Sequence, residues 1–207
     1  TVRFDAAEQK TCLFTIFQDT HLHLTGKQLL FLLVIRLDPS KVRGAEQEGT
    51  MCGIVGLFLK DKSLEPKLGE MLTEMLITMT DRGPDSAGIA IYGGAGDGIA
   101  KITVQSANPD TDFATLDEDL KDAIGTPVLM LVKSTHAVLE VPAGQLEAAR
   151  SALSHIRPSV KVMSVGDSLE IYKEVGLPKD VAKRFDVSKM HGTHGIGHTR
   201  IATESDV

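Results

Sequence analysis

The clearest pattern of apolar and polar positions lies between residues 51 and 105. Residues 51–59 form a continuous apolar run that contains two glycines, which is typical of a buried strand. Apolar side chains then recur at steps of 4, 3, 1, 3, 1 and 3, at Leu64, Leu68, Met71, Leu72, Met75, Leu76 and Met79. This spacing predicts one face of a helix. Residues 86–92 and 99–105 are predicted to be two further strands.

The glycine-rich residues 93–98 separate the last two of these strands. A phosphate-binding loop would lead into a helix, whereas a strand is predicted to follow this segment, and no Lys-Ser or Lys-Thr pair comes after it. The pattern therefore predicts a hairpin turn.

Residues 128–185 alternate between short strand-like and helix-like patterns. Residues 128–132, 137–141 and 160–165 are predicted strands, and residues 142–156 and 178–185 are predicted helices. This region carries no dense group of polar side chains. We interpret residues 99–190 as an α+β insertion with a structural or docking role.

The first 50 residues have no sustained period of 2 or 3.6, and the sequence predicts no fold for them. Their most apolar window, residues 29–35, is much shorter than the roughly 20 residues that a membrane-spanning helix needs. Charged residues follow it, which is unlike a secretory signal peptide. We expect residues 1–50 to be a non-native or upstream-translated extension, or else a propeptide or appended element.

Composition narrows the class of protein. The 207 residues carry a net charge of −6 and scattered basic residues, which does not favour nucleic acid or a membrane as a partner. With only Cys12 and Cys52, the chain has no disulfide framework, so a reducing compartment, the cytoplasm, is expected. The length suits one domain, with or without an appendage.

Cys52 is the first candidate for chemistry. If translation starts at Met51 and this residue is removed, Cys52 carries both a thiol and a free α-amino group. A free α-amine has a pKa of about 8, so it can act as the general base for its own thiol at neutral pH. The alternative is a buried structural thiol in front of an apolar strand.

A second group of candidates lies in residues 194–205. A short strand with two glycines leads to Arg200, whose guanidinium is suited to holding a carboxylate, and Thr203 and Ser205 add hydroxyls. By itself this pattern is that of an amino-acid or phosphate clamp. The spacing of His191, His194 and His198 does not favour a metal site, because His191 would point away from the other two.

Three ordered motifs together resemble the class II glutamine amidotransferases, whose nucleophile is an N-terminal cysteine. The motifs are residues 51–56 as the opening strand, residues 81–88 as the turn after the first helix, and residues 195–203 as the strand that holds glutamine. The form of residues 80–85 and 202–205 is most similar to the glutamate-synthase-related branch, the GlxB type, which includes the small subunit of N-methylglutamate synthase.

The resemblance implies an α+β fold of the N-terminal nucleophile (Ntn) hydrolase type, a four-layer α/β/β/α sandwich of antiparallel sheets. Residues 52–207 would form this domain, incomplete at its C-terminal end and interrupted by the insertion at about 99–190. Cys52 would attack the glutamine side-chain amide and release glutamate and ammonia without a metal or organic cofactor. The implied substrate-binding residues are Arg200, Thr203, His198, Arg82 and Asp85.

The same resemblance implies a synthase subunit as the partner that receives the ammonia. It also implies that the oxyanion-hole Asn-Gly pair lies beyond residue 207, so the activity of this chain is expected to be low. Two alternatives stay open. One is a noncatalytic Ntn-fold regulatory or assembly subunit of a glutamate-synthase-like complex, and the other is an Ntn hydrolase that acts on a different amide.

Overall fold

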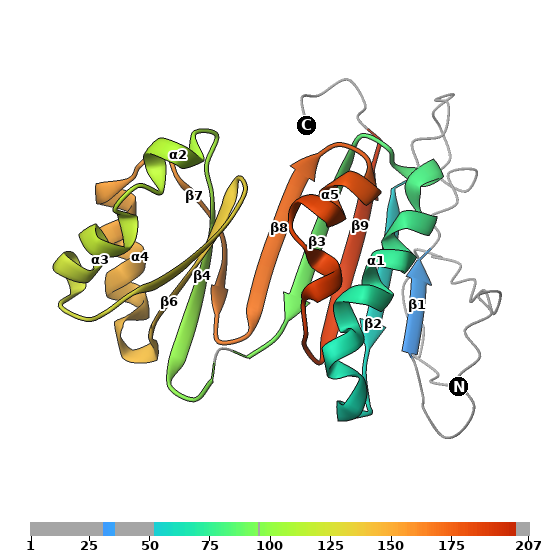
Figure 1. Ribbon diagram of the computed structural model, residues 1–207, viewed down its shortest axis with the longest axis horizontal. Helices are drawn as coiled ribbons and strands as arrows, with labels where there is room; N and C mark the ends of the chain where they lie inside the picture. The colour runs from blue at the N-terminus through green and yellow to red at the C-terminus, as the bar shows by residue number, and fades with distance from the viewer. Residues whose placement is uncertain (1–30, 36–51, 95, 202–207) are drawn as a thin grey trace, which may run out of the picture.

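The computed structural model describes residues 31–35, 52–94 and 96–201, with the backbone alone for residues 31–35 (Figure 1). These residues form two antiparallel sheets. The first has the strand order β1 (Phe31–Ile35), β2 (Gly53–Phe58), β9 (His194–Arg200), β3 (Ser86–Tyr92) and β8 (Leu169–Val175). The second has the order β5 (Leu129–Lys133), β6 (His136–Pro142), β4 (Ile99–Gln105) and β7 (Lys161–Gly166).

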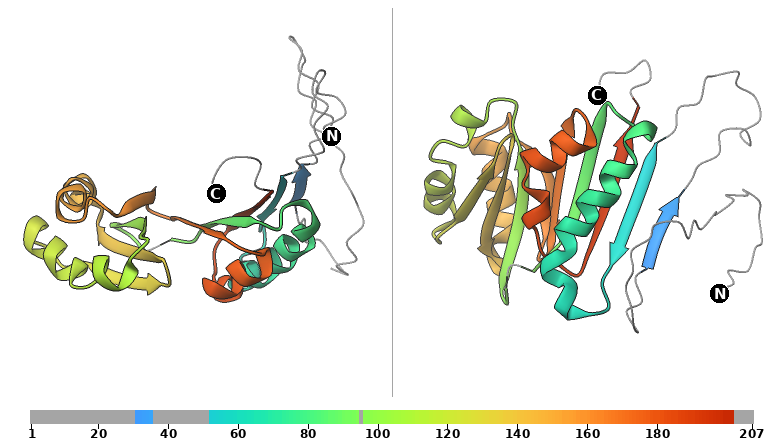
Figure 2. Two further views of the ribbon diagram at one scale, coloured as in Figure 1. Left: turned by 90° about the horizontal axis from the view of Figure 1, so that it is seen from above. Right: turned by 45° about the vertical axis from the view of Figure 1, so that its right-hand side comes forward.

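Helices cover one face of each sheet, and the two sheets lie side by side (Figures 1 and 2). The first sheet carries α1 (Leu68–Thr78) and α5 (Pro178–Arg184), with the short 3-10 turns η2 (Lys62–Lys67), η3 (Thr80–Arg82) and η5 (Val187–Lys189). The second sheet carries α3 (Leu116–Ile124) and α4 (Leu146–Ile156), with α2 (Pro109–Asp112) and the 3-10 turn η4 (Ala143–Gln145). Each sheet has its own apolar core. The expected α+β class with antiparallel sheets is therefore confirmed.

The predicted first helix is confirmed over its central turns, where Leu68, Leu72 and Leu76 are fully buried against the first sheet. Leu64 lies in η2 instead, a 3-10 turn that contains Pro66. A proline lacks the N–H that a longer α-helix would need at this position, so the regular helix begins after it.

Two glycines of β9 allow α1 to lie directly on the sheet. A Cβ at Gly195 would be 2.8 Å from Leu72 Cδ2, and a Cβ at Gly197 would be 2.8 Å from Leu76 Cδ1. Both distances are too short for real contacts, so the strand can be this close to the helix only because these positions have no side chain.

The predicted hairpin at residues 93–98 is wrong. β3 pairs along its whole length with β8, from Ser86↔Val175 to Tyr92↔Leu169, whereas β4 lies in the other sheet. Residues 93–98 thus lead from one sheet to the other, and residues 167–168 lead back. The sequence pattern of two strands joined by a glycine-rich segment is the same for a hairpin and for a connection between two sheets. Which strand each one pairs with depends on the tertiary structure.

The second sheet is a unit inserted between the two strands of the β3–β8 pair. Its chain order is β4, α3, β5, β6, α4, β7, and its strand order is β5-β6-β4-β7. This is the βαββαβ arrangement of the ferredoxin-like fold. Residues 169–190, which the sequence analysis grouped with the insertion, lie with the first sheet as β8, α5 and η5.

His136 is fully buried where the inserted unit meets the first sheet. Its ring contacts Tyr172 and Phe185, with ring centroids 5.6 and 4.9 Å away. Nε2 accepts a hydrogen bond from the Lys173 backbone N–H at 3.3 Å, which leaves the proton on Nδ1, 3.1 Å from Thr135 Oγ1. Burial lowers the pKa of His136 to about 4, despite the nearby Glu174 carboxylate.

Residues 31–35 form an edge strand of the first sheet and pair with β2 from Phe31↔Phe58 to Ile35↔Ile54. The rest of the 1–50 segment lies outside the described residues, and its nature stays a prediction. Among the described residues, no helix has both the length and the apolar character required to cross a bilayer.

We predict that Gly69→Ala destabilises the fold. A Cβ at this position in α1 would lie 2.0 Å from the Val187 carbonyl oxygen and 2.6 Å from that of Met190, both backbone atoms that cannot rotate away. Overpacking of this kind lowers the free energy of unfolding by about 1–3 kcal/mol. The measurement is urea unfolding beside Gly144→Ala, where nothing lies within 4 Å. Equal losses in both variants would contradict the close approach.

We also predict that acid lowers the free energy of unfolding through His136, which is buried where the inserted unit meets the first sheet. Between pH 6.5 and pH 4 the unfolded chain binds a proton at this imidazole that the folded chain does not bind. The contribution of His136 to the free energy of unfolding is therefore fully present above pH 6.5 and is lost as the pH falls. The loss between pH 7 and pH 4.5 is about 2 kcal/mol.

Urea unfolding at these two pH values measures the effect. His136→Asn keeps a donor near Thr135 but cannot titrate, so its free energy of unfolding should fall less with acid than that of the wild type. His155→Gln, which removes an exposed imidazole on α4, is the control and should behave as the wild type. An unchanged pH dependence in His136→Asn would rule out this role.

Candidate functional site

The first sheet has one face covered by α1 and α5 and one open face, and the side chains of β9 alternate between them. Thr199 is fully buried on the helix side with Gly195 and Gly197, and its hydroxyl donates to the Met79 carbonyl at 3.2 Å. The side chains on the open face are His194, Ile196, His198 and Arg200.

One end of the open face brings together the starts of two strands and the end of a third. Arg200 pairs with Ser86 of β3, and Thr199 pairs with Gly53 of β2. If the β2–β9 pairing is extended by one residue, Cys52 lies opposite Arg200. The Cys52 thiol is free and the residue is half-buried.

The turn before β3 packs against the backbone of Arg200. Asp85 N–H donates to the Arg200 carbonyl at 3.2 Å, and the Asp85 carbonyl accepts from Gly176 N–H at 2.7 Å. A Cβ at Gly83 would lie 2.3 Å from Arg200 N, so only glycine lets the turn come this close. Arg82, at the end of η3, therefore lies beside the same strand end.

His198 lies one row further along the open face, between Ile54 of β2 and Gly88 of β3. Gly88 in turn pairs with Lys173 of β8, whose Cγ would be 4.0 Å from a Cβ at Gly88. Burial lowers the pKa of His198 from 6.5, and the positive charges of Lys173 and Arg200 lower it further. The imidazole is thus neutral at pH 7 in a positively charged surrounding, which suits an anionic group on this face.

The opposite end of the open face is aromatic. The His194 ring stacks on Tyr92 with centroids 3.9 Å apart and contacts Phe58 at 5.7 Å. His194 and His198 share the face but are four residues apart on a strand, roughly 13 Å. They therefore cannot bind one metal ion together, and the described residues contain no group of three His, Cys, Asp or Glu side chains arranged to hold one.

The structure thus brings most of the residues selected from the sequence to one end of the first sheet. Cys52, His198 and Arg200 lie on its open face, and Arg82 and Asp85 lie in the turn that packs against the Arg200 backbone. Thr203 lies outside the described residues. Sequence analysis missed Lys173, because it belongs to no motif and β8 was not predicted. Its only signal was the alternation in residues 169–175, which puts Lys173 on the same side as Leu169 and Ile171.

The chain is similar to two curated proteins. It is 65% identical over 157 residues to the "Glutamine amidotransferase-like protein GlxB" of Rhizobium meliloti, a match that covers 76% of this chain and 52% of that protein. It is 34% identical over 170 residues to a "Putative glutamine amidotransferase" of Methanothermobacter thermautotrophicus, covering 76% of this chain and 54% of that protein. These matches support a glutamine amidotransferase family.

The chain spans about half the length of both relatives. No family model matches it.

We predict that Lys173→Met raises the pKa of His198. The substitution keeps the apolar stem over Gly88 but removes a positive charge that disfavours the imidazolium, while burial still holds the pKa below 6.5. NMR titration of the imidazole carbon-bound protons measures the shift. Lys179→Met, an exposed substitution on α5, is the matched control. The same His198 pKa in wild type, Lys173→Met and control would show that Lys173 does not act on this imidazole.

Proposed function

We propose that this chain provides the glutaminase part of a class II glutamine amidotransferase, with Cys52 as the nucleophile. The observation that supports this most is the meeting of three chain segments at one end of the open face. These are the start of β2 after Cys52, the end of β9 with Arg200, and the turn that contains Asp85. In this proposal the open face of the first sheet is the inner face of an Ntn-type four-layer sandwich.

The chemistry requires a thiol and a base at the same place. In a protein that begins at Cys52, the α-amine takes the thiol proton and the sulfur attacks the side-chain carbonyl carbon of glutamine. The C–N bond breaks, the nitrogen takes a proton and leaves as ammonia, and a thioester remains on Cys52. Water then cleaves the thioester, which gives glutamate and restores the thiol.

Arg200 is proposed to hold the α-carboxylate of glutamine through two parallel N–H donors. His198 is neutral at pH 7 and lines the same face, so it can accept or donate a hydrogen bond without adding charge. Arg82 and Asp85 would form the wall of the site, because their turn is bound to the Arg200 backbone. Thr203 is proposed to contact the substrate beyond the end of β9.

The ammonia is proposed to pass to a synthase subunit in the cytoplasm. The inserted unit offers a surface for such a partner, because its edge strand β5 exposes Leu129, Leu131 and Val132. An exposed apolar edge strand is open to pairing with another chain. The same surface favours a second candidate function, a noncatalytic assembly subunit that uses the Ntn fold only for docking.

Labelling of a protein that begins at Cys52 with a diazoketone analogue of glutamine tests the proposal. We expect one label on Cys52 by mass spectrometry, no label in Cys52→Ala, and much slower labelling in Arg200→Lys, because lysine cannot form the two parallel bonds. Excess glutamine should protect the wild-type thiol. Glutamate release, measured in parallel, should fall to background in Cys52→Ala.

A matched protein that keeps residues 1–51 controls for the free amine and should label far more slowly. Labelling that is equal in both proteins would remove the α-amine from the mechanism. An unlabelled Cys52 in a folded protein, together with a Cys52→Ala variant that still supports the activity of a synthase complex, would favour the assembly subunit.

A further inference from the structure

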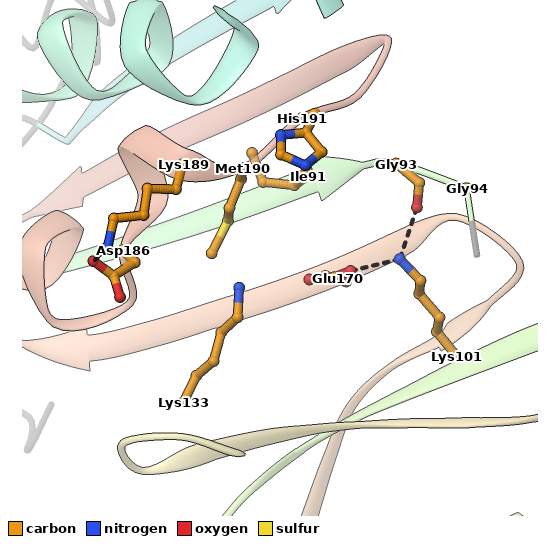
Figure 3. Close-up of a pocket in the computed structure, with 10 residues that line it drawn as sticks. All are labelled: Ile91, Gly93, Gly94, Lys101, Lys133, Glu170, Asp186, Lys189, Met190 and His191. Carbon is orange, nitrogen blue, oxygen red and sulfur yellow. Dashed lines mark hydrogen bonds and ion pairs between the residues drawn. The ribbon is translucent and has the colours of Figure 1, made fainter. Parts of the chain in front are cut away.

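A pocket lies where the inserted unit meets the helix-covered side of the first sheet (Figure 3). Its volume is about 340 Å³, within the range of small-molecule sites. Lys101 and Lys133 enter it from strands of the inserted unit, whereas Glu170 comes from β8 and Asp186 and Lys189 come from the segment after α5.

Both carboxylates of the pocket are already paired. Glu170 Oε1 accepts from Lys101 Nζ at 2.6 Å, and its other oxygen accepts from the Tyr172 hydroxyl. The Lys101 side chain is only 8% exposed, so this pair is shielded from solvent. Asp186 pairs with Lys189 at 3.0 Å.

Lys133 is the third cation of the pocket. Within the described part of the chain it forms no salt bridge with Glu170 or Asp186, although both carboxylates are near enough to act on its charge. Its Nζ lies over the face of the Tyr172 ring, 5.3 Å from the ring centroid. Figure 3 shows the side chain pointing into the space below Met190 and between Glu170 and Asp186. Burial lowers the pKa of Lys133 and the positive charge of Lys101 lowers it further, whereas the carboxylates of Glu170 and Asp186 act in the opposite direction.

The pocket therefore has three ammonium groups and two carboxylates among its lining side chains. A ligand with one negative group would complete the charge balance at Lys133. Ile91 and Met190 line the same space and would contact a short apolar portion of that ligand.

We propose that this pocket binds a small organic anion whose carboxylate or phosphate group pairs with Lys133. The ligand would contact both the inserted unit and the first sheet, so its binding would hold the two together. The site is separate from the proposed glutamine site. Ile91 pairs with Glu170 in the rows that face the helices, whereas His198 and Arg200 lie on the open face.

Calorimetric titration with inorganic phosphate, and separately with succinate, tests the site at fixed ionic strength. We expect at least one probe to bind the wild type, and binding to weaken by about tenfold or more in Lys133→Met, the order of magnitude of a lost charge-assisted hydrogen bond. Lys161→Met, an exposed substitution on β7, should bind as the wild type. The probe that binds identifies the anionic group.

Trace acetylation followed by mass spectrometry gives a second measurement on the unchanged protein. The bound probe should protect Lys133 from acetylation and leave the acetylation of Lys161 unchanged. Because this measurement uses the wild-type protein, it does not depend on the folding of Lys133→Met. The proposal is overturned if neither probe binds the wild type, if Lys133→Met binds as tightly as the wild type, or if Lys133 is not protected. None of these results depends on glutaminase activity.

Discussion

Leu72 and Leu76 of α1 lie on the first sheet where β9 has glycines, and the arrangement of the site depends on this packing. With Gly195 and Gly197 on the helix side, Ile196, His198 and Arg200 must face the other way, because side chains alternate along a strand. The same contact fixes the register of β9 between β2 and β3. A slip of one residue would place side chains against α1 and turn Arg200 away from the open face.

The inserted unit shows how a domain can be added without disturbing this arrangement. It interrupts the connection between β3 and β8, which still pair along their full length. The insertion creates an interface between the inserted unit and the first sheet. This interface buries His136 and encloses charged side chains such as Lys101 and Glu170. A buried imidazole and buried ion pairs hold geometry well but tolerate changes of protonation poorly. The junction is therefore where the molecule should respond to acid and to anions.

The two faces of the first sheet have different chemistry. The open face combines Arg200, Lys173 and a neutral His198 with the segment that starts at Cys52, and its positive charge suits a ligand with a carboxylate. The helix side buries apolar residues along most of its length and carries charged groups on β8, at Glu170 and Glu174, at the edge next to the insertion.

Local patterns in the sequence determined the strands around residues 53–58 and 86–92 and the central turns of α1, because periodicity is a property of short segments. Motif spacing also supplied the candidate site residues, whose roles stay a proposal. Local patterns missed α3, although Leu116, Leu120 and the following Gly125 carry a helical pattern, and they missed β8. The tertiary structure alone decided that β3 pairs with β8 rather than β4, and that Lys173 lies beside His198. Strand partners and the contacts of a buried His136 or Lys133 depend on residues far apart in the chain, about which no local pattern carries information.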